Sequence, residues 1–195
     1  SVIRGTIPFF LFFVIMLSQL SAEPGIVSIS LQTSPEVAVK KDVRYSTKAQ
    51  AGITGESYLS VDILDRAFVQ AGLGYCYFRP SGPGSDWVIY RGYSSFYFGG
   101  GFGFYFDRAM LFDFIPLEPG LAFRGFANYA SYNYTPIHFF YPSVELEPFT
   151  TVGRLFGDHL EFRAGVPLHW NLQRDLEFSF SGGLSLSGVL YFPSF

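Results

Sequence analysis

The chain has 195 residues and a formal net charge of -3; 20% of its residues are aromatic and only 15% are charged. Disorder is excluded because a disordered chain combines low hydrophobicity with high charge, and the single cysteine, Cys76, excludes a disulfide scaffold. Beyond residue 22 no apolar run reaches the roughly 20 residues of a membrane-spanning helix. The mild acidity gives no reason to expect a nucleic-acid partner.

Residues 1–22 predict a secretory signal peptide. Arg4 precedes an almost wholly apolar run at 7–17, and small or polar residues follow as far as Ala22. This order of basic, apolar and small-residue regions is typical of signal peptides. A membrane anchor or a buried helix is the alternative, but the apolar run is too short to span a bilayer comfortably. We expect cleavage near Ala22, which leaves 23–195 as one domain.

The rest of the chain repeats with a period of two. In 66–78 (RAFVQAGLGYCYF) the odd positions are apolar and the even positions are mostly small or polar. Only a strand places alternate residues on opposite faces. The alternation continues through Gly182 and Gly183, so these glycines are expected inside a strand and not in a turn. The pattern predicts eight strands, at 26–34, 53–64, 66–78, 87–106, 109–132, 137–150, 158–170 and 175–192.

The two faces of these strands differ in an unusual way. One face carries large aromatic and branched residues, and the other carries Gly, Ser and Tyr with scattered charges. A soluble barrel would show water a face rich in Lys, Glu and Thr, whereas a transmembrane barrel is apolar outside and polar inside. We therefore predict an all-β fold, a closed antiparallel up-and-down eight-stranded transmembrane β-barrel. A soluble secreted barrel that binds a lipid is the structural alternative.

An even strand number places both termini on one side of the membrane. With the termini in the periplasm, inner turns are expected near Asp65, near Asp107 and Arg108, and at 151–157. The outer loops are then 35–52, 79–86, 133–136 and 171–174. Aromatic residues near the strand ends predict interfacial girdles; they are Trp87, Tyr129, Tyr132, Tyr134, Trp170, Tyr191 and Phe192.

The sequence ends in LSLSGVLYFPSF, with Phe195 last. A signal peptide, eight alternating strands and a terminal Phe together resemble the small outer-membrane β-barrels of the OmpA, OmpX and OmpW type, found in the Gram-negative cell envelope. The resemblance covers 23–195 as architecture. It implies an outer-membrane location, contact with outer-membrane lipid, and recognition of Phe195 by the barrel-assembly machinery. The OmpW-like branch further implies porin-like passage of small hydrophobic solutes that enter the barrel and leave sideways.

The alternation also predicts which charged and polar groups face the lumen. They are Glu56, Asp62, Arg66, Glu118, Arg124, Glu145, Glu147, Glu161, Arg163, His169 and Glu177. Eight strands leave just enough interior space for side chains, and charges buried there must pair. A salt-bridged plug is the favoured interpretation, with a narrow passage or a small-molecule pocket as the alternative. No cofactor is expected, since no metal-ligand spacing appears in the sequence.

Three functions follow from this interpretation. The first is a structural or small-solute role in the outer membrane. The second is adhesion through loops 35–52 and 79–86, the first of which carries Lys40, Lys41, Arg44 and Lys48. The third is a lipid-modifying enzyme, for which His169 is the best available candidate for a catalytic histidine. We do not expect an enzyme, because no convincing Ser–His or Asp–His pair is evident.

Overall fold

The computed structural model describes residues 27–41, 47–79, 92–107, 109–111, 115–132, 138–156, 159–172 and 178–192. Among these residues, no helix is long and apolar enough to cross a membrane. The strands are β1 (Val27–Lys41), β2 (Thr47–Leu64), β3 (Ala67–Phe78), β4 (Tyr93–Tyr105), β5 (Ala109–Leu111), β6 (Ile115–Tyr132), β7 (His138–Leu155), β8 (Leu160–Gly165), β9 (Leu168–Asn171), β10 (Phe178–Gly183) and β11 (Ser185–Phe192). The predicted signal peptide at 1–22 lies outside the described residues.

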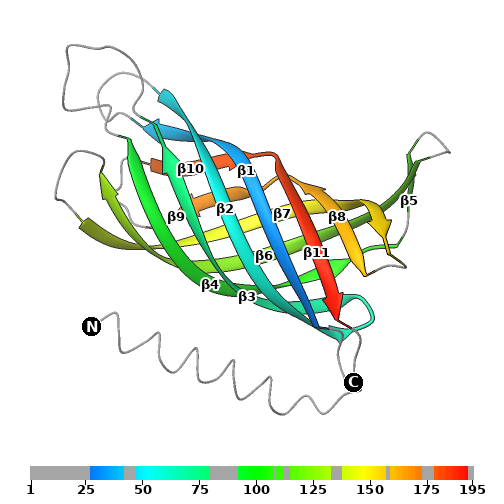
Figure 1. Cartoon of the computed structure of the whole chain (residues 1–195). Helices are drawn as coiled ribbons and strands as arrows, with labels where there is room; N and C mark the ends of the chain where they lie inside the picture. Colours follow the sequence, from blue (N-terminus) through cyan, green and yellow to red (C-terminus); the bar gives the residue numbers. More distant parts are fainter. Residues whose placement is uncertain are drawn as a thin grey trace.

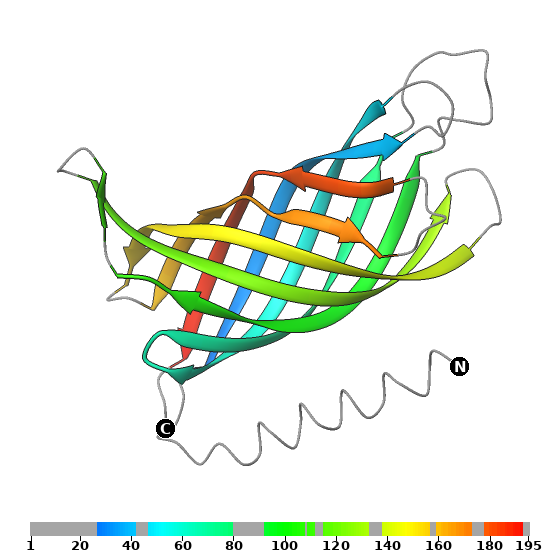
Figure 2. The ribbon, with the colours of Figure 1, turned by 180° about the vertical axis from the view of Figure 1, so that it is seen from behind.

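The strands form one closed antiparallel barrel (Figures 1 and 2). β1 pairs with β2, β2 with β3 and β3 with β4; β4 then pairs with β6, and β6 with β7. On the other side, β7 pairs with β8 and β9, while β10 and β11 both pair with β1 and close the ring. Because β8 and β9 share one strand path and β10 and β11 share another, the ring has eight positions, as predicted. The short β5 extends the β4–β6 hairpin at one end.

Prolines explain why two of the eight paths are interrupted. β1 pairs Glu36 with Gly183 and Thr33 with Leu186, so the register is unchanged across Leu184. The residue opposite Leu184 is Pro35, which has no N–H to donate and only accepts a bond from the Leu184 N–H at 3.3 Å. The interruption between β8 and β9 likewise lies opposite a proline, Pro148. Residues 178–192 therefore follow one path, with a change of direction visible in Figure 1.

The predicted boundaries of the longest outer loop were wrong. Residues 35–52 were expected to form it, but β1 continues to Lys41 and β2 begins at Thr47. Pro35 and the charged residues after it look like a loop in the sequence, yet the inside–outside alternation continues through them. The predicted inner turn at 151–157 is also shorter, because β7 extends to Leu155. Phe156 starts that turn in the left-handed region, with φ 55°.

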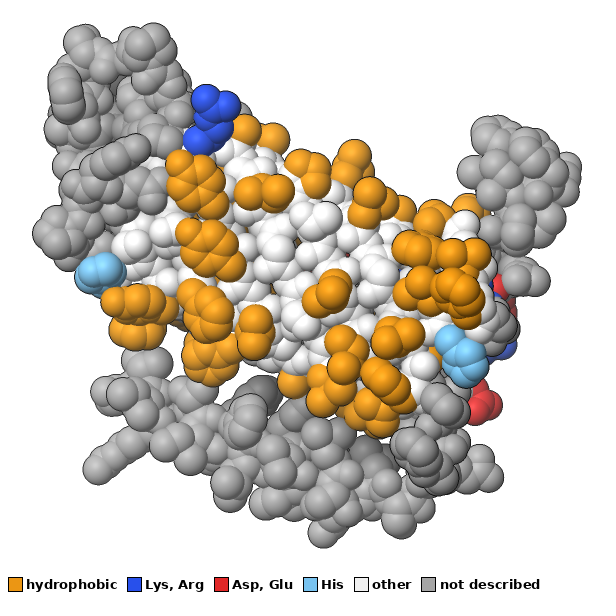
Figure 3. Space-filling view, viewed as in Figure 1, with side chains coloured by type: hydrophobic (Ala, Val, Ile, Leu, Met, Phe, Trp, Pro, Cys, Tyr) orange, Lys and Arg blue, Asp and Glu red, His pale blue; other side chains and the backbone are white. Residues whose placement is uncertain are grey.

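The outer wall of the barrel is apolar. Leu31 is 66% exposed and Phe98 is 56% exposed, whereas their chain neighbours Gln32 and Tyr97 are buried. Hydrophobic side chains cover the wall in Figure 3, and on that face the charged ones lie only near the two ends. Soluble monomers rarely expose an apolar surface this extensive. The apolar outside agrees with the inverted faces predicted from the sequence and is characteristic of transmembrane barrels.

Large aromatic side chains fill the interior by lying over glycines of the next strand. A Cβ added to Gly74 of β3 would lie 2.5 Å from the Tyr97 ring of β4. A Cβ added to Gly103 of β4 would collide with the Phe68 ring of β3. Such approaches leave no room for any side chain larger than hydrogen. This packing explains why the inward face of the sequence is rich in glycine.

Candidate functional site in the barrel interior

Two ends of the barrel must be distinguished to place the interior residues. The turn end carries Asp65 and Arg66, and Val27 pairs there with Phe192. The loop end is the opposite one, where Lys41 of β1 pairs with Thr47 of β2. Charged side chains gather in two interior groups. The loop-side cluster consists of Glu36, Glu56, Arg124, Glu145, Glu147 and His169, and the turn-side cluster of Glu118, Arg154, Glu161 and Arg163.

Arg124 of β6 ties the loop-side cluster across the lumen. Its Nη1 donates to Glu145 Oε1 and, at 2.5 Å, to Glu147 Oε2, both on neighbouring β7. Its guanidinium also lies 4.3 Å from the centre of the Tyr58 aromatic ring. Tyr58 is on β2, which is three strands away from β6 around the barrel. The side chains of Arg124 and Glu145 are 6% and 0% exposed. A charge pair this deeply buried requires hydrogen bonds on both partners.

Glu147 receives those bonds from several strands. Gln32 Nε2 of β1 donates to Glu147 Oε1 at 3.0 Å, and Ser185 Oγ of β11 donates to the same oxygen at 2.5 Å. Since β1 and β7 are three positions apart in the ring, the Gln32 bond crosses the lumen. The middle of the barrel is therefore closed by a network that links β1, β2, β6, β7 and β11.

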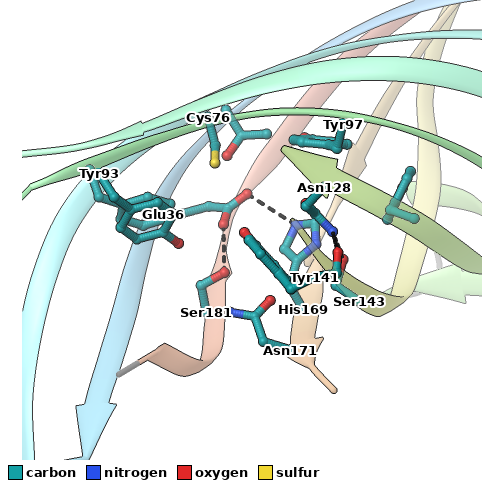
Figure 4. A pocket seen from close by; sticks show the side chains of 13 residues that line it. Glu36, Cys76, Tyr93, Tyr97, Asn128, Tyr141, Ser143, His169, Asn171 and Ser181 are labelled. Carbon is teal, nitrogen blue, oxygen red and sulfur yellow. Dashed lines mark hydrogen bonds and ion pairs between the residues drawn. The ribbon is translucent and has the colours of Figure 1, made fainter. Parts of the chain in front are cut away.

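His169 of β9 connects the remaining carboxylates of this cluster. Its Nε2 lies 3.2 Å from Glu36 Oε1 and 3.1 Å from Glu145 Oε2. Ser181 Oγ donates to Glu36 Oε2 at 3.0 Å, and Figure 4 shows both contacts of Glu36. Glu56 accepts a 2.5 Å hydrogen bond from the Tyr97 hydroxyl on its Oε1. Four strands thus bring these acidic groups and one imidazole together.

A small pocket adjoins this group on the side of the loop end. Glu36, Cys76, Tyr93, Asn171 and Ser181 are among the residues that line it (Figure 4). The volume open to the centre of a water-sized sphere is about 20 Å³. This is little more than one water molecule requires. In the described part of the chain, the pocket is therefore too small for an organic solute.

The turn-side cluster is balanced in charge. Arg163 Nε donates to Glu161 Oε1 at 2.5 Å, and Arg154 pairs with both Glu161, at 3.2 Å, and Glu118. The Arg163 guanidinium also donates to the hydroxyls of Tyr105 and Tyr191. Tyr191, which the sequence placed in a lipid-facing girdle, is thus an interior residue. Two arginines and two glutamates close this end of the lumen.

The structure places most of the predicted lumen residues in the interior, with exceptions. Asp62 and Glu118 are only half-buried, at the turn end. Arg66 was wrongly predicted to face the lumen. It lies in the β2–β3 turn, beyond a register shift in β2, and its side chain is 63% exposed and pairs with Asp107 at 2.6 Å. Glu177 and Phe195 lie outside the described residues. The interior residues are Glu56, Arg124, Glu145, Glu147, Glu161, Arg163 and His169.

Two charged residues of these clusters, buried Glu36 and partly exposed Arg154, were missed in the sequence. Glu36 fell within the predicted loop 35–52, and Arg154 within the predicted turn 151–157. The alternation that begins at Gln32 could have identified Glu36, because Gln32, Ser34 and Glu36 all occupy the buried face of β1. Arg154 has no such signal, because β7 shifts register between Thr151 and Gly153.

Comparison with known proteins supports the fold. No family model and no curated protein matches the chain. Among solved structures, Neisserial surface protein A superposes with a TM-score of 0.61 and is 14% identical, covering 85% of this chain and 97% of its own. Ail from Yersinia pestis gives 0.47 and 12%, covering 87% and 100%. The N-terminal barrel domain of Pseudomonas aeruginosa OprF gives 0.43 and 11%, covering 85% and 99%.

Only the first of these similarities is close enough to support an argument, and at this identity it concerns the fold alone. It agrees with the eight-position antiparallel ring and with the resemblance noted in the sequence. The chain has the fold of the small eight-stranded outer-membrane β-barrels.

Proposed function

We propose that this protein is a structural barrel of the outer membrane whose lumen is closed to solutes. The observation that carries the proposal is the Arg124 network, which joins opposite walls at mid-barrel through Glu145, Glu147 and Gln32. The outer-membrane location is supported by the apolar wall and by the likeness to a Neisserial surface protein.

The energetics of the network argue against a solute path along the barrel axis. An ion on that path would have to separate Arg124 from its buried glutamates. Breaking such a pair by removing one partner typically costs about 3–5 kcal/mol. The turn-side cluster presents a second barrier of the same kind. Passage of small hydrophobic solutes by a sideways exit would require a different route, and it stays a prediction.

The other two functions predicted from the sequence also remain open. The adhesion prediction rests on 35–52 and 79–86, but 35–41 and 47–52 belong to β1 and β2, and 42–46 and 80–86 lie outside the described residues. An enzymatic role for His169 has little support, because its Nε2 lies against two carboxylates, Glu36 and Glu145. No described contact pairs His169 with a serine hydroxyl. With the lumen closed, the loop end is the surface at which we would next seek a partner.

Single-channel recording tests the closed lumen. We expect the protein, purified in detergent and inserted into a planar bilayer in concentrated KCl, to show no steady conductance. Because the turn-side cluster is a second barrier, Arg124→Ala should produce openings when it is combined with Arg163→Ala, which removes the donor that holds Glu161. Arg66→Ala removes an exposed arginine and serves as the matched control, which should stay silent. Steady conductance in the unaltered protein would overturn the proposal.

A further inference from the structure

The two interior clusters differ in charge. The turn-side cluster pairs two glutamates with two arginines. The loop-side cluster has four glutamates and one arginine, Arg124, whose bonds go to Glu145 and Glu147. Even a protonated His169 would leave this cluster with excess negative charge. Buried carboxylates without counter-charge are costly and are neutralised either by bound protons or by a cation.

Several buried polar atoms of the loop-side cluster have no hydrogen-bond partner. They are Glu36 Oε1, Glu56 Oε2, Glu145 Oε2, His169 Nε2 and the donor Arg124 Nε. Glu36, Glu56 and Glu145 are each more than nine-tenths buried. One ligand atom from each of Glu56, Glu145 and His169 lies within 4.8 Å of the others, and Glu36 Oε1 lies 3.2 Å from His169 Nε2. Ligand atoms of Glu56, Glu145 and His169 thus converge, and His169 Nε2 lies between the carboxylates of Glu36 and Glu145.

The second oxygen of each of these carboxylates is held by the protein. Ser181 donates to Glu36 Oε2, Tyr97 donates to Glu56 Oε1, and Arg124 donates to Glu145 Oε1. Outer-shell donors of this kind orient ligands in metal sites. The arrangement leaves one oxygen of each carboxylate directed into the cluster.

We propose that Glu56, Glu145 and His169 bind a divalent transition-metal ion such as Zn²⁺ inside the barrel, with Glu36 next to them in contact with His169. Tetrahedral ligands about 2.0–2.1 Å from zinc lie about 3.3–3.4 Å from one another. The distance from His169 Nε2 to Glu145 Oε2, 3.1 Å, is close to that spacing. The imidazole nitrogen favours Zn²⁺ over Ca²⁺ and Mg²⁺, which prefer oxygen ligands.

The adjoining pocket provides space next to the site. It is lined by both Glu36 and His169, together with Thr54 and Asn171. Its volume of about 20 Å³ for water-sized spheres would accommodate a water molecule beside the ion. The inference is independent of the closed lumen, because an ion held in a plugged barrel and an ion held in a conducting one would contact the same residues.

Metal binding to the purified, detergent-solubilised protein tests this site. After chelator treatment and its removal, we expect isothermal titration with Zn²⁺ to show one ion per chain, with Ca²⁺ and Mg²⁺ failing to compete. His169→Gln and Glu56→Gln should each weaken Zn²⁺ binding more than about tenfold. His138→Gln alters an exposed histidine on the outer wall and is the matched control, which should bind as the unaltered protein does.

Two results would overturn the proposal. One is the absence of stoichiometric Zn²⁺ binding by the unaltered protein. The other is unchanged affinity in His169→Gln and Glu56→Gln variants that still show the heat-modifiable migration of a folded barrel. If both variants fail to fold, Co²⁺ added to the unaltered protein decides the question. Visible d–d absorption that Zn²⁺ abolishes supports the site, and absorption equal to that of free Co²⁺ contradicts it.

Discussion

At the residue scale, Arg124 links the strands of the loop-side cluster through buried ion pairs. It pairs with Glu145 and Glu147 in a volume from which water is nearly excluded. Arg66 provides the contrast, because its pairing with Asp107 is exposed at the turn end. The same residue type therefore contributes very differently to stability at the two positions.

Arg124→Ala should lower the free energy of unfolding by about 3–5 kcal/mol, since it leaves two buried carboxylates without their cation. Arg66→Ala should change it by less than about 1 kcal/mol, because exposed ion pairs contribute little. Urea unfolding in lipid vesicles, followed by tryptophan fluorescence, measures both. Equal effects of the two substitutions would contradict the interior placement of Arg124.

Gly74 is a second residue whose role depends on its neighbour. A side chain there would meet the Tyr97 ring, and Tyr97 holds Glu56 in the loop-side cluster. We expect Gly74→Val to destabilise the barrel by about 1–3 kcal/mol, as overpacking does. Gly55, on the outer wall, has no atom within 4 Å of an added Cβ, so Gly55→Val should be tolerated. The same unfolding assay compares them, and equal tolerance would show that the interior is loosely packed.

At the element scale, each strand separates a lipid-facing row from an interior row. Phe98, in the middle of β4, is directed outward, and Tyr97 beside it is buried. Leu64 is the last residue of β2, at the turn end. The cost of placing a charge on the outer wall should depend on its distance from the strand ends.

Phe98→Arg should cost about 2–4 kcal/mol, and Leu64→Arg about 0–1 kcal/mol, because the penalty for a charge falls towards the membrane interface. Folding yield and urea midpoint in vesicles measure the difference. A penalty for Phe98→Arg no larger than that for Leu64→Arg would mean that the β4 wall does not face hydrocarbon.

The element scale also shows how far the sequence predicts this structure. Alternation identified all eight strand paths, because the period of two persists through the glycines and the interrupting prolines. It did not identify the full length of β1 and β2, because Pro35 and the charges beyond it resemble a loop. Nor did it predict the loop-side cluster. Glu36, Glu56, Glu145 and His169 lie on four different strands, and only the registers between strands bring them together.

At the scale of the whole molecule, the high aromatic and glycine content reflects a barrel whose outer face is apolar and whose inner face is polar. Large apolar side chains cover the outside, glycines admit aromatic rings to the inside, and the few charges pair within the lumen. The ring is closed by β1 against β10 and β11, so it leaves no free sheet edge within the barrel.

Membrane association with heat-modifiable migration tests this account most directly. The account predicts that the expressed protein stays in the outer-membrane pellet after alkaline carbonate extraction. It also predicts that the unheated protein migrates differently in an electrophoresis gel from the boiled protein, because the closed barrel resists the detergent. Release into the soluble fraction, or identical migration before and after boiling, would contradict the transmembrane barrel.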